Sequence, residues 1–345
     1  MHPVAKYFYI MGGLFFTGYL LVISASLFNP LLGAFIFAMA LRPLAIRLES
    51  FKIPRLLSSL LTVFLFVIIF LGMVFFFSIQ VKDMNFEVKT VGENFNGIAG
   101  KIQHWLTDLT GISIAEQSTL LKEAFNTALR NSALYINKTL SATTNVVTSF
   151  VIFIISLFFF LQYRRFFISF LAQIVSVKNH ARLIKTLNKM QAVVKSYILG
   201  LLLIILIVAT LNTIGLLVLG ISNAMLFGVM AAVLTLIPYI GILLGALLPT
   251  TFALFTTNSL WYPLGVIIIF MSIQFLEGNV LTPNIVGRQV SINPFAAILG
   301  LIVGSMLLGL PGIMFALPVL AMIKVICDEV NVLKPLGYLL GNPSA

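Results

Sequence analysis

The longest stretch of this chain without a charged side chain covers 81 residues, from 196 to 276. A helix that crosses the hydrocarbon core of a bilayer needs about 20 apolar residues, so the stretch has room for about four passes. Only 9% of the whole chain is charged and 60% is hydrophobic, whereas soluble domains carry about 25% charged residues. The sequence therefore predicts an all-α, polytopic membrane protein.

Prolines and glycines divide the apolar sequence into shorter helices. Asn29 and Pro30 lie inside the first charge-free run, and proline interrupts the helical hydrogen-bond ladder, so we expect one helix to end at Phe28 and a second to run from Pro30 to about Ile46. Similar breaks are expected near 220–223, 237–241, 256–258 and 309–312. The short segments 224–237 and 240–255 are then predicted to form a hairpin or a broken helix, and about eight spanning helices result. The five charge-free runs are 7–41, 56–81, 139–163, 196–276 and 289–323.

Lysine and arginine predict the orientation, because they concentrate in cytoplasmic loops. Segment 164–195 has seven basic residues and no acidic one, whereas 82–138 has six of each. Both termini are therefore expected to be cytoplasmic, in an inner membrane, with the lipid bilayer as partner. The predicted parts are N-terminal membrane helices (1–81), an extracytoplasmic helical insert (82–138), a transmembrane helix (139–163), a cytoplasmic amphipathic segment (164–195), a C-terminal membrane transport region (196–326) and a cytoplasmic tail (327–345).

Several classes of function are disfavoured. The net charge of +11 comes from basic residues beside apolar runs rather than from a basic face with interleaved aromatics, which argues against nucleic-acid binding. The chain has no phosphate-binding G-x-x-x-x-G-K-[ST] loop. Its three histidines lie outside the apolar runs, no aspartate lies inside one, and Cys327 is the single cysteine. We expect no enzyme activity, no cofactor and no metal site.

Glu277 is the leading candidate for a binding residue. It is the only carboxylate between Glu123 and Asp328, and it ends an apolar run. An ionisable group near membrane depth is costly, so it is a functional candidate that could bind a proton, a sodium ion or a polar solute. The alternative is an interface residue that pairs with Arg288. The candidate solute or ion site comprises Glu277, Gln274, Asn279, Asn212 and Arg288; for Asn212, helix–helix hydrogen bonding is the alternative.

The second group of candidates shapes the backbone. Proline frees a carbonyl and glycine allows close approach of another segment. Freed carbonyls near the middle of a membrane bind ions or polar solutes in transporters, although a plain kink is the alternative. The candidate elements are Pro238, Tyr239, Gly241, Pro283, Pro294, Pro311 and Gly312.

An ordered set of motifs resembles the autoinducer-2 exporter family of permeases. The resemblance covers the whole chain in layout and is most specific over 196–323. One departure is that Ile242 and Leu243 follow Gly241, where many members have a proline. The motifs are LGISNA at 219–224, IPYIG at 237–241, QFLEGN at 274–279 with Pro283, VG at 286–287, NP at 293–294, and LGLPG at 308–312 with Pro318.

The resemblance implies about eight spans, no ATPase domain, and transport down or coupled to a gradient. It also implies homo-oligomers, with pentamers suggested, and movement of the broken-helix half against a fixed scaffold. Some members are associated with export of a small signalling molecule and others with sodium/proton exchange. The leading hypothesis is a transporter of a small polar solute or ion. The alternatives are a sodium/proton antiporter and, from another class, a non-transporting membrane scaffold or assembly factor.

Overall fold

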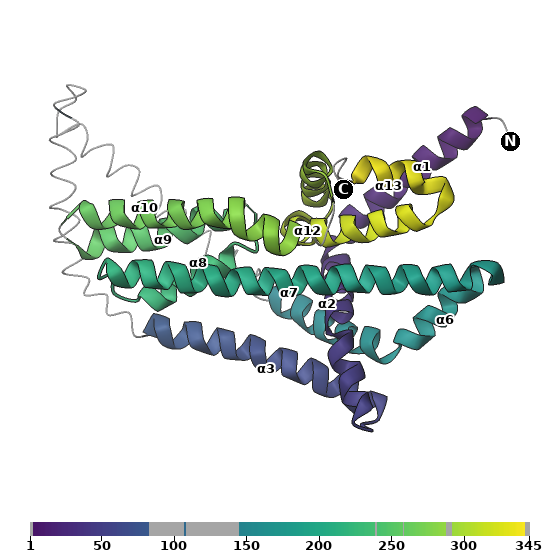
Figure 1. Ribbon diagram of the computed structural model, residues 1–345, viewed down its shortest axis with the longest axis horizontal. Coiled ribbons are helices and arrows are strands. Elements are labelled where there is room, and N and C mark those ends of the chain that lie inside the picture. Colours follow the sequence, from purple (N-terminus) through teal and green to yellow (C-terminus); the bar gives the residue numbers. More distant parts are fainter. Residues whose placement is uncertain are drawn as a thin grey trace.

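The computed structural model describes residues 3–82, 107, 145–238, 240–257, 259–287 and 292–341 (Figure 1). These residues form helices without any strand, and six of the helices are long and apolar enough to cross a membrane. The prediction of an all-α, polytopic membrane protein is confirmed. The predicted helical insert 82–138 lies almost wholly outside the described residues.

The N-terminal part consists of α1 (Pro3–Ile23), α2 (Ala25–Ser50), α3 (Arg55–Lys82) and the helix Asn145–Gln162. The expected break at Asn29 and Pro30 is wrong, because α1 ends before Ser24 and α2 continues through Pro30. Proline is tolerated inside membrane helices where neighbouring elements compensate for the lost hydrogen bond. Beside Pro30, Asn29 donates a hydrogen bond to a carbonyl of another helix, Leu308, at 3.2 Å, which joins the two helices but does not replace the bond that proline lacks.

Small side chains hold the N-terminal helices together. Ala34, Ala38 and Ala45 of α2 are buried against α3 and the helix Asn145–Gln162. Small residues let membrane helices approach closely. The aromatic ring of Phe37 meets the ring of Phe66 at 5.3 Å and that of Phe153 at 5.8 Å, both edge to face.

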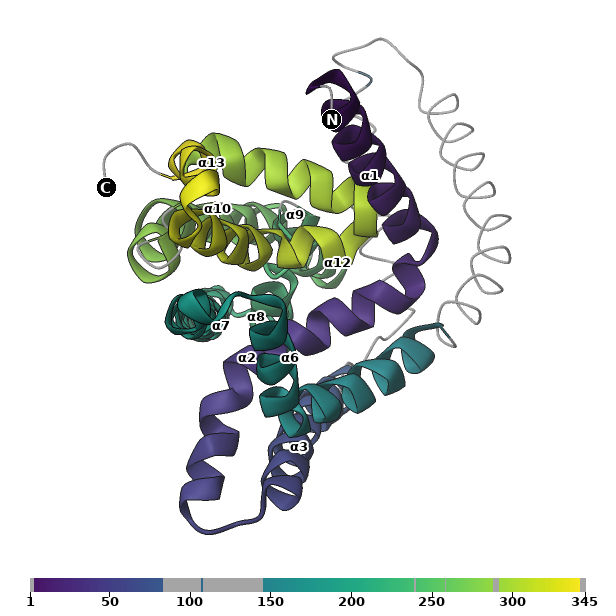
Figure 2. The ribbon, with the colours of Figure 1, turned by 90° about the vertical axis from the view of Figure 1, so that its right-hand side faces the viewer.

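The longest helix, α7 (His180–Val218), runs along much of the molecule. It follows α6 (Arg164–Ile174) and a 3-10 turn, Val177–Asn179. Helix α7 therefore runs without a break from the basic segment into the uncharged stretch. Seen along α7 in Figure 2, α2 crosses it steeply. A hydrophobic core of α7, α2 and α12 side chains, including Ile36, Val194 and Ala321, joins the N-terminal and C-terminal parts.

The next two helices, α8 (Ala224–Leu234) and α9 (Ile240–Thr256), form the predicted hairpin. Its tip is tight: a Cβ added at Gly241 would lie 1.6 Å from the carbonyl oxygen of Leu234. Pro238 cannot donate to that carbonyl, but the amide of Ile237 does so at 2.9 Å. The expectation of a freed carbonyl is therefore wrong for Leu234.

The last two apolar segments are both irregular. Helix α10 (Trp261–Leu276) continues into two π-helical turns, Glu277–Leu281 and Pro283–Gly287. Helix α12 (Pro294–Glu329) folds back at Gly309, whose φ of 64° is the left-handed conformation that favours glycine. The predicted break at 309–312 is thus confirmed, and Figure 2 shows the two arms.

Two glycines let the arms of α12 meet near the turn. A Cβ at Gly304 would lie 2.5 Å from the carbonyl oxygen of Gly312, so neither position has room for a side chain. Pro294 opens the first arm as its first helical residue, where the missing amide hydrogen costs little. Asn293 caps this arm by accepting a hydrogen bond from the amide of Ala296 at 2.8 Å. The chain then ends in α13 (Lys334–Leu340), which packs on α12.

Candidate functional site

Glu277 lies on the side of α10 that faces the protein. Val266 and Phe270 are buried in the core formed with α7 and α8, and Ile273 packs against the core shared with α2 and α12. Glu277 follows these positions at the spacing of four, three and four residues that keeps one face of a helix. A carboxylate therefore interrupts an otherwise apolar contact surface, and its side chain is half-buried.

Two side chains donate hydrogen bonds to this carboxylate. The side-chain nitrogen of Gln274 donates to Oε2 at 2.6 Å, and the hydroxyl of Thr282 donates to Oε1. Both donors are half-buried. The sequence prediction that Gln274 and Glu277 belong to one site is consistent with this geometry, whereas the alternative pairing with Arg288 falls outside the described residues.

Thr282 was not among the predicted residues. In an α-helix, side chains three or four positions apart are neighbours, and a residue five positions on faces elsewhere. Glu277–Leu281 is a π-helical turn, which brings position five back to the same side. The only sequence signal was a hydroxyl residue five places after Glu277, and this spacing is informative only once the π turn is known.

The tip of the α8–α9 hairpin lies at the same level along α7 as Glu277. Gly228 of α8 contacts Thr213, and the two helices run antiparallel, so Leu234 at the end of α8 reaches the level of Ile207. Ile269 of α10 contacts Gly215, and counting along this antiparallel pair places Glu277 at the level of Ile207 as well.

This level is the middle of the charge-free part of α7. Lys195 is the last charged residue of α7, and the helix ends at Val218, so Ile207 lies halfway along the uncharged part. An irregular backbone at membrane depth is tolerated where protein surrounds it or where it lines a wet cavity. The hairpin tip and the beginning of the π-helical turns are two irregular elements at this level.

The other predicted polar residues differ in their surroundings. Asn279 is exposed, and its side-chain amide donates to the carbonyl of Phe275 in its own helix at 2.9 Å. This bond does not involve Glu277. Asn212 is only 3% exposed, and its Oδ1 has no hydrogen-bond partner among the described residues. Tyr239 and Arg288 lie outside the described residues.

The remaining backbone candidates divide between two places. Pro238 and Gly241 form the α8–α9 tip, and Pro283 begins the second π-helical turn. Pro311 and Gly312 follow the turn of α12, whose Leu308 carbonyl is bonded by Asn29 of α2. Pro294 lies apart from both places because it begins α12.

Removing the hydroxyl that supports Glu277 should lower stability measurably. Thr282→Val is expected to destabilise the protein by about 1–3 kcal/mol, because a hydrogen bond to a charged group is lost. Thr282→Ser keeps a hydroxyl and should retain most of the stability. The matched control is Thr210→Val, whose hydroxyl donates only to the carbonyl of Leu206 in its own helix. Thermal unfolding in detergent measures the difference, and equal losses for Thr282→Val and Thr210→Val would contradict the assignment.

Comparison with known proteins provides independent information. A family model described as AI-2E family transporter matches residues 8–331. The "Putative transport protein YueF" of Bacillus subtilis is 31% identical over 323 residues, which cover 88% of this chain and 84% of YueF. The "AI-2 transport protein TqsA" of Escherichia coli is 24% identical over 313 residues, covering 89% of this chain and 87% of TqsA.

Proposed function

Because this chain belongs to the AI-2E family of transporters, we propose that it carries a small polar solute or ion across the membrane through its C-terminal half, driven by a gradient and without hydrolysing ATP. Membership of the family supports a membrane transporter. The name of TqsA refers to AI-2, and a small polar signalling molecule of that kind is the substrate class that we propose for this chain.

The observation that carries the proposal is the coincidence of two irregular elements at one depth. The hairpin tip at Pro238 and Gly241 and the carboxylate of Glu277 both lie level with Ile207 of α7. Transporters use discontinuous helices of this kind to present polar groups near the middle of the membrane. A purely structural protein has no need of a carboxylate on the buried face of an apolar helix, since such a group is costly there.

The roles within the site follow from the contacts. Glu277 receives the solute, the ion or a proton, while Gln274 and Thr282 hold its carboxylate in one orientation. Asn212 lies on α7 five residues from Ile207. Its Oδ1, which has no hydrogen-bond partner among the described residues, is an acceptor that a solute could use. The geometry favours these residues over Asn279.

The direction from which the hairpin enters follows from the predicted topology. If the basic segment 164–195 faces the cytoplasm, α7 leads away from it, and α8 and α9 enter the membrane from the far side. The hairpin tip then points from that side toward the cytoplasm, and movement of the hairpin would change access to the site near the middle of the membrane. This orientation, the inner-membrane location and the homo-oligomer remain predictions.

The proposal is tested by flux into proteoliposomes that contain the purified chain and no nucleotide. We expect saturable uptake or release of at least one member of a panel of small polar solutes, sugars, diols and monovalent cations, and we expect the flux to follow the imposed gradient. Liposomes without protein are the control for leakage. Absence of flux for the entire panel, with correctly folded protein in the membrane, would favour the scaffold alternative.

A further inference from the structure

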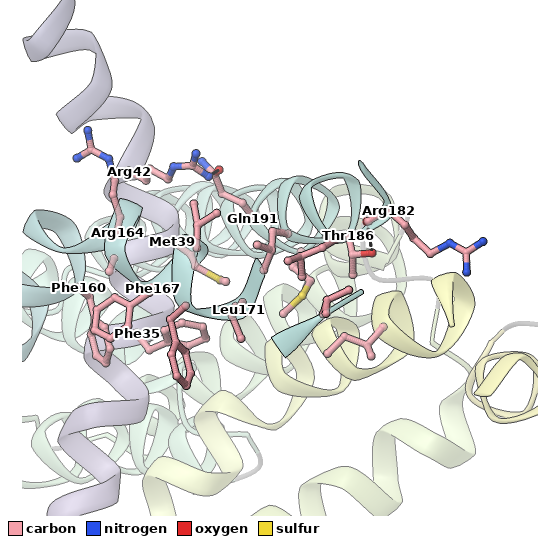
Figure 3. Close-up of a pocket in the computed structure, with 18 of the residues that line it drawn as sticks. Phe35, Met39, Arg42, Phe160, Arg164, Phe167, Leu171, Arg182, Thr186 and Gln191 are labelled. Atoms are coloured by element: carbon pink, nitrogen blue, oxygen red, sulfur yellow. Dashed lines mark hydrogen bonds between the residues drawn. The ribbon is translucent and has the colours of Figure 1, made fainter. Parts of the chain in front are cut away.

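A second candidate site lies around the beginning of α7, away from the hairpin tip. A cavity of about 670 Å³ opens between α2, the helix Asn145–Gln162, α6, α7 and the end of α12 (Figure 3). Pockets for small molecules typically have volumes of about 300–1,000 Å³. Glu277 does not line this cavity, so it is separate from the proposed transport site.

Apolar side chains form most of its wall. From α6, Ile168 and Leu171 line the cavity, and Phe35 and Met39 of α2 line it from the other side. Helix α6 is strongly amphipathic, yet none of its residues is buried. Part of its apolar face lines the cavity, through Phe167, Ile168, Phe170 and Leu171.

One end of the cavity is positively charged. Figure 3 shows the guanidinium groups of Arg42 and Arg164 gathered there. Arg164 forms an ion pair with Glu49, and the Nε of Arg55 lies 4.0 Å from the same carboxylate. Two guanidinium groups thus contact a single carboxylate, and with Arg42 beside them the local charge remains positive.

Arg42 has a hydrogen-bond donor that is not used within the described residues. It donates to the side-chain oxygen of Gln191, a neutral group, and its buried Nε has no hydrogen-bond partner among the described residues. Arg182 also lines the cavity, but at the opposite end, and its guanidinium points away from Arg42. A buried donor without a partner is costly, and the planar guanidinium fits a phosphate with two hydrogen bonds.

We propose that this cavity binds an anionic phospholipid, with an acyl chain between α2, α6 and α7 and the phosphate at Arg42. The apolar wall and the cationic end match the two halves of such a lipid. Basic pockets between membrane helices on the cytoplasmic side are typical sites for anionic headgroups, and segment 164–195 is the most basic part of this chain. The proposal is independent of solute transport by Glu277.

The headgroup half of the proposal is tested by lipid binding to the delipidated full-length chain in detergent. Phosphatidylglycerol and phosphatidylcholine with identical acyl chains are titrated, and bound lipid is counted by native mass spectrometry. The wild type should bind phosphatidylglycerol about tenfold more tightly, and Arg42→Gln should reduce this preference to below about threefold, since a charge-assisted hydrogen bond is lost. Arg165→Gln, an exposed neighbour on α6 that does not line the cavity, is the matched control and should retain the preference.

A second variant tests whether the acyl chain occupies the apolar part of the cavity. Ile168→Trp adds bulk inside the cavity and should weaken both lipids by a similar factor without changing the preference. The proposal fails if the wild type binds both lipids equally, or if Arg165→Gln loses as much preference as Arg42→Gln. It also fails if Arg42→Gln changes the oligomeric state and leaves lipid preference intact, since the cavity would then be an interface between copies. Unfolding temperatures measured without added lipid show whether each variant is folded.

Discussion

Replacing Gly241 by alanine should destabilise the protein by about 3 kcal/mol or more, which is at the upper end for overpacked sites. The added methyl group would lie 1.6 Å from the Leu234 carbonyl oxygen and 2.3 Å from its carbon. Those atoms belong to the backbone of the hairpin tip, so a side-chain rotation cannot relieve the overlap. The tip would have to open, which separates the end of α8 from the beginning of α9.

The matched control is Gly72→Ala in α3, where a Cβ would meet no atom within 4 Å. Alanine has a higher helix propensity than glycine, so this change should be neutral or stabilising by about 1 kcal/mol. Thermal unfolding of both variants in detergent measures the difference. Equal stability of Gly241→Ala and the wild type would show that the tip is looser than the structure describes. If the Gly241→Ala protein folds, its solute flux shows whether transport needs the closed hairpin tip.

Glu277→Gln should lower solute flux by about tenfold or more, because a charge-assisted interaction with the solute or ion is worth about 1.5–3 kcal/mol. The substitution keeps the shape of the side chain, and an amide oxygen can still accept the hydrogen bond from Thr282. Any dependence of flux on pH that arises from protonation of Glu277 should disappear. Flux into proteoliposomes over a series of pH values measures both effects.

Asn279→Ala is the control for this experiment, because Asn279 lies two residues away and donates only to its own helix at Phe275. We expect it to change flux by less than about twofold. Unchanged flux and unchanged pH dependence in Glu277→Gln would remove Glu277 from the transport mechanism. An equal loss in both variants would indicate that the π-helical segment is sensitive to any change.

The positions of the breaks illustrate how far residue types predict this fold. Gly309 is needed because the chain turns through a left-handed conformation, and the pattern around it already predicted a break there. The spacing of breaks in an uncharged run predicted either a hairpin or a broken helix, and the structure shows the hairpin of α8 and α9. Asn29 and Pro30 carried the same kind of signal, yet α2 passes through them, because packing of α2 against α12 decides whether a proline ends a helix or lies within one.

The candidate site shows the same division. A lone carboxylate at the end of an apolar run was visible in the sequence, and Gln274, three residues earlier, was grouped with it. The role of Thr282 depends on a π-helical turn, which no residue pattern specified. The common level of the hairpin tip and Glu277 depends on how α8 and α10 pack along α7. The cavity at Arg42 joins residues from α2, α6, α7 and α12.

The amino-acid sequence by itself determined that most of the chain lies in a lipid bilayer, that it is helical, and where it can bend. These properties are local, since they depend on the apolar content of each segment and on the conformational limits of proline and glycine. The long uncharged stretch at 196–276 thus predicted short helices in a membrane. Only the tertiary structure decided which of those bends are used and which polar groups meet, because helix packing joins residues far apart in the chain, at distances that no sequence spacing records.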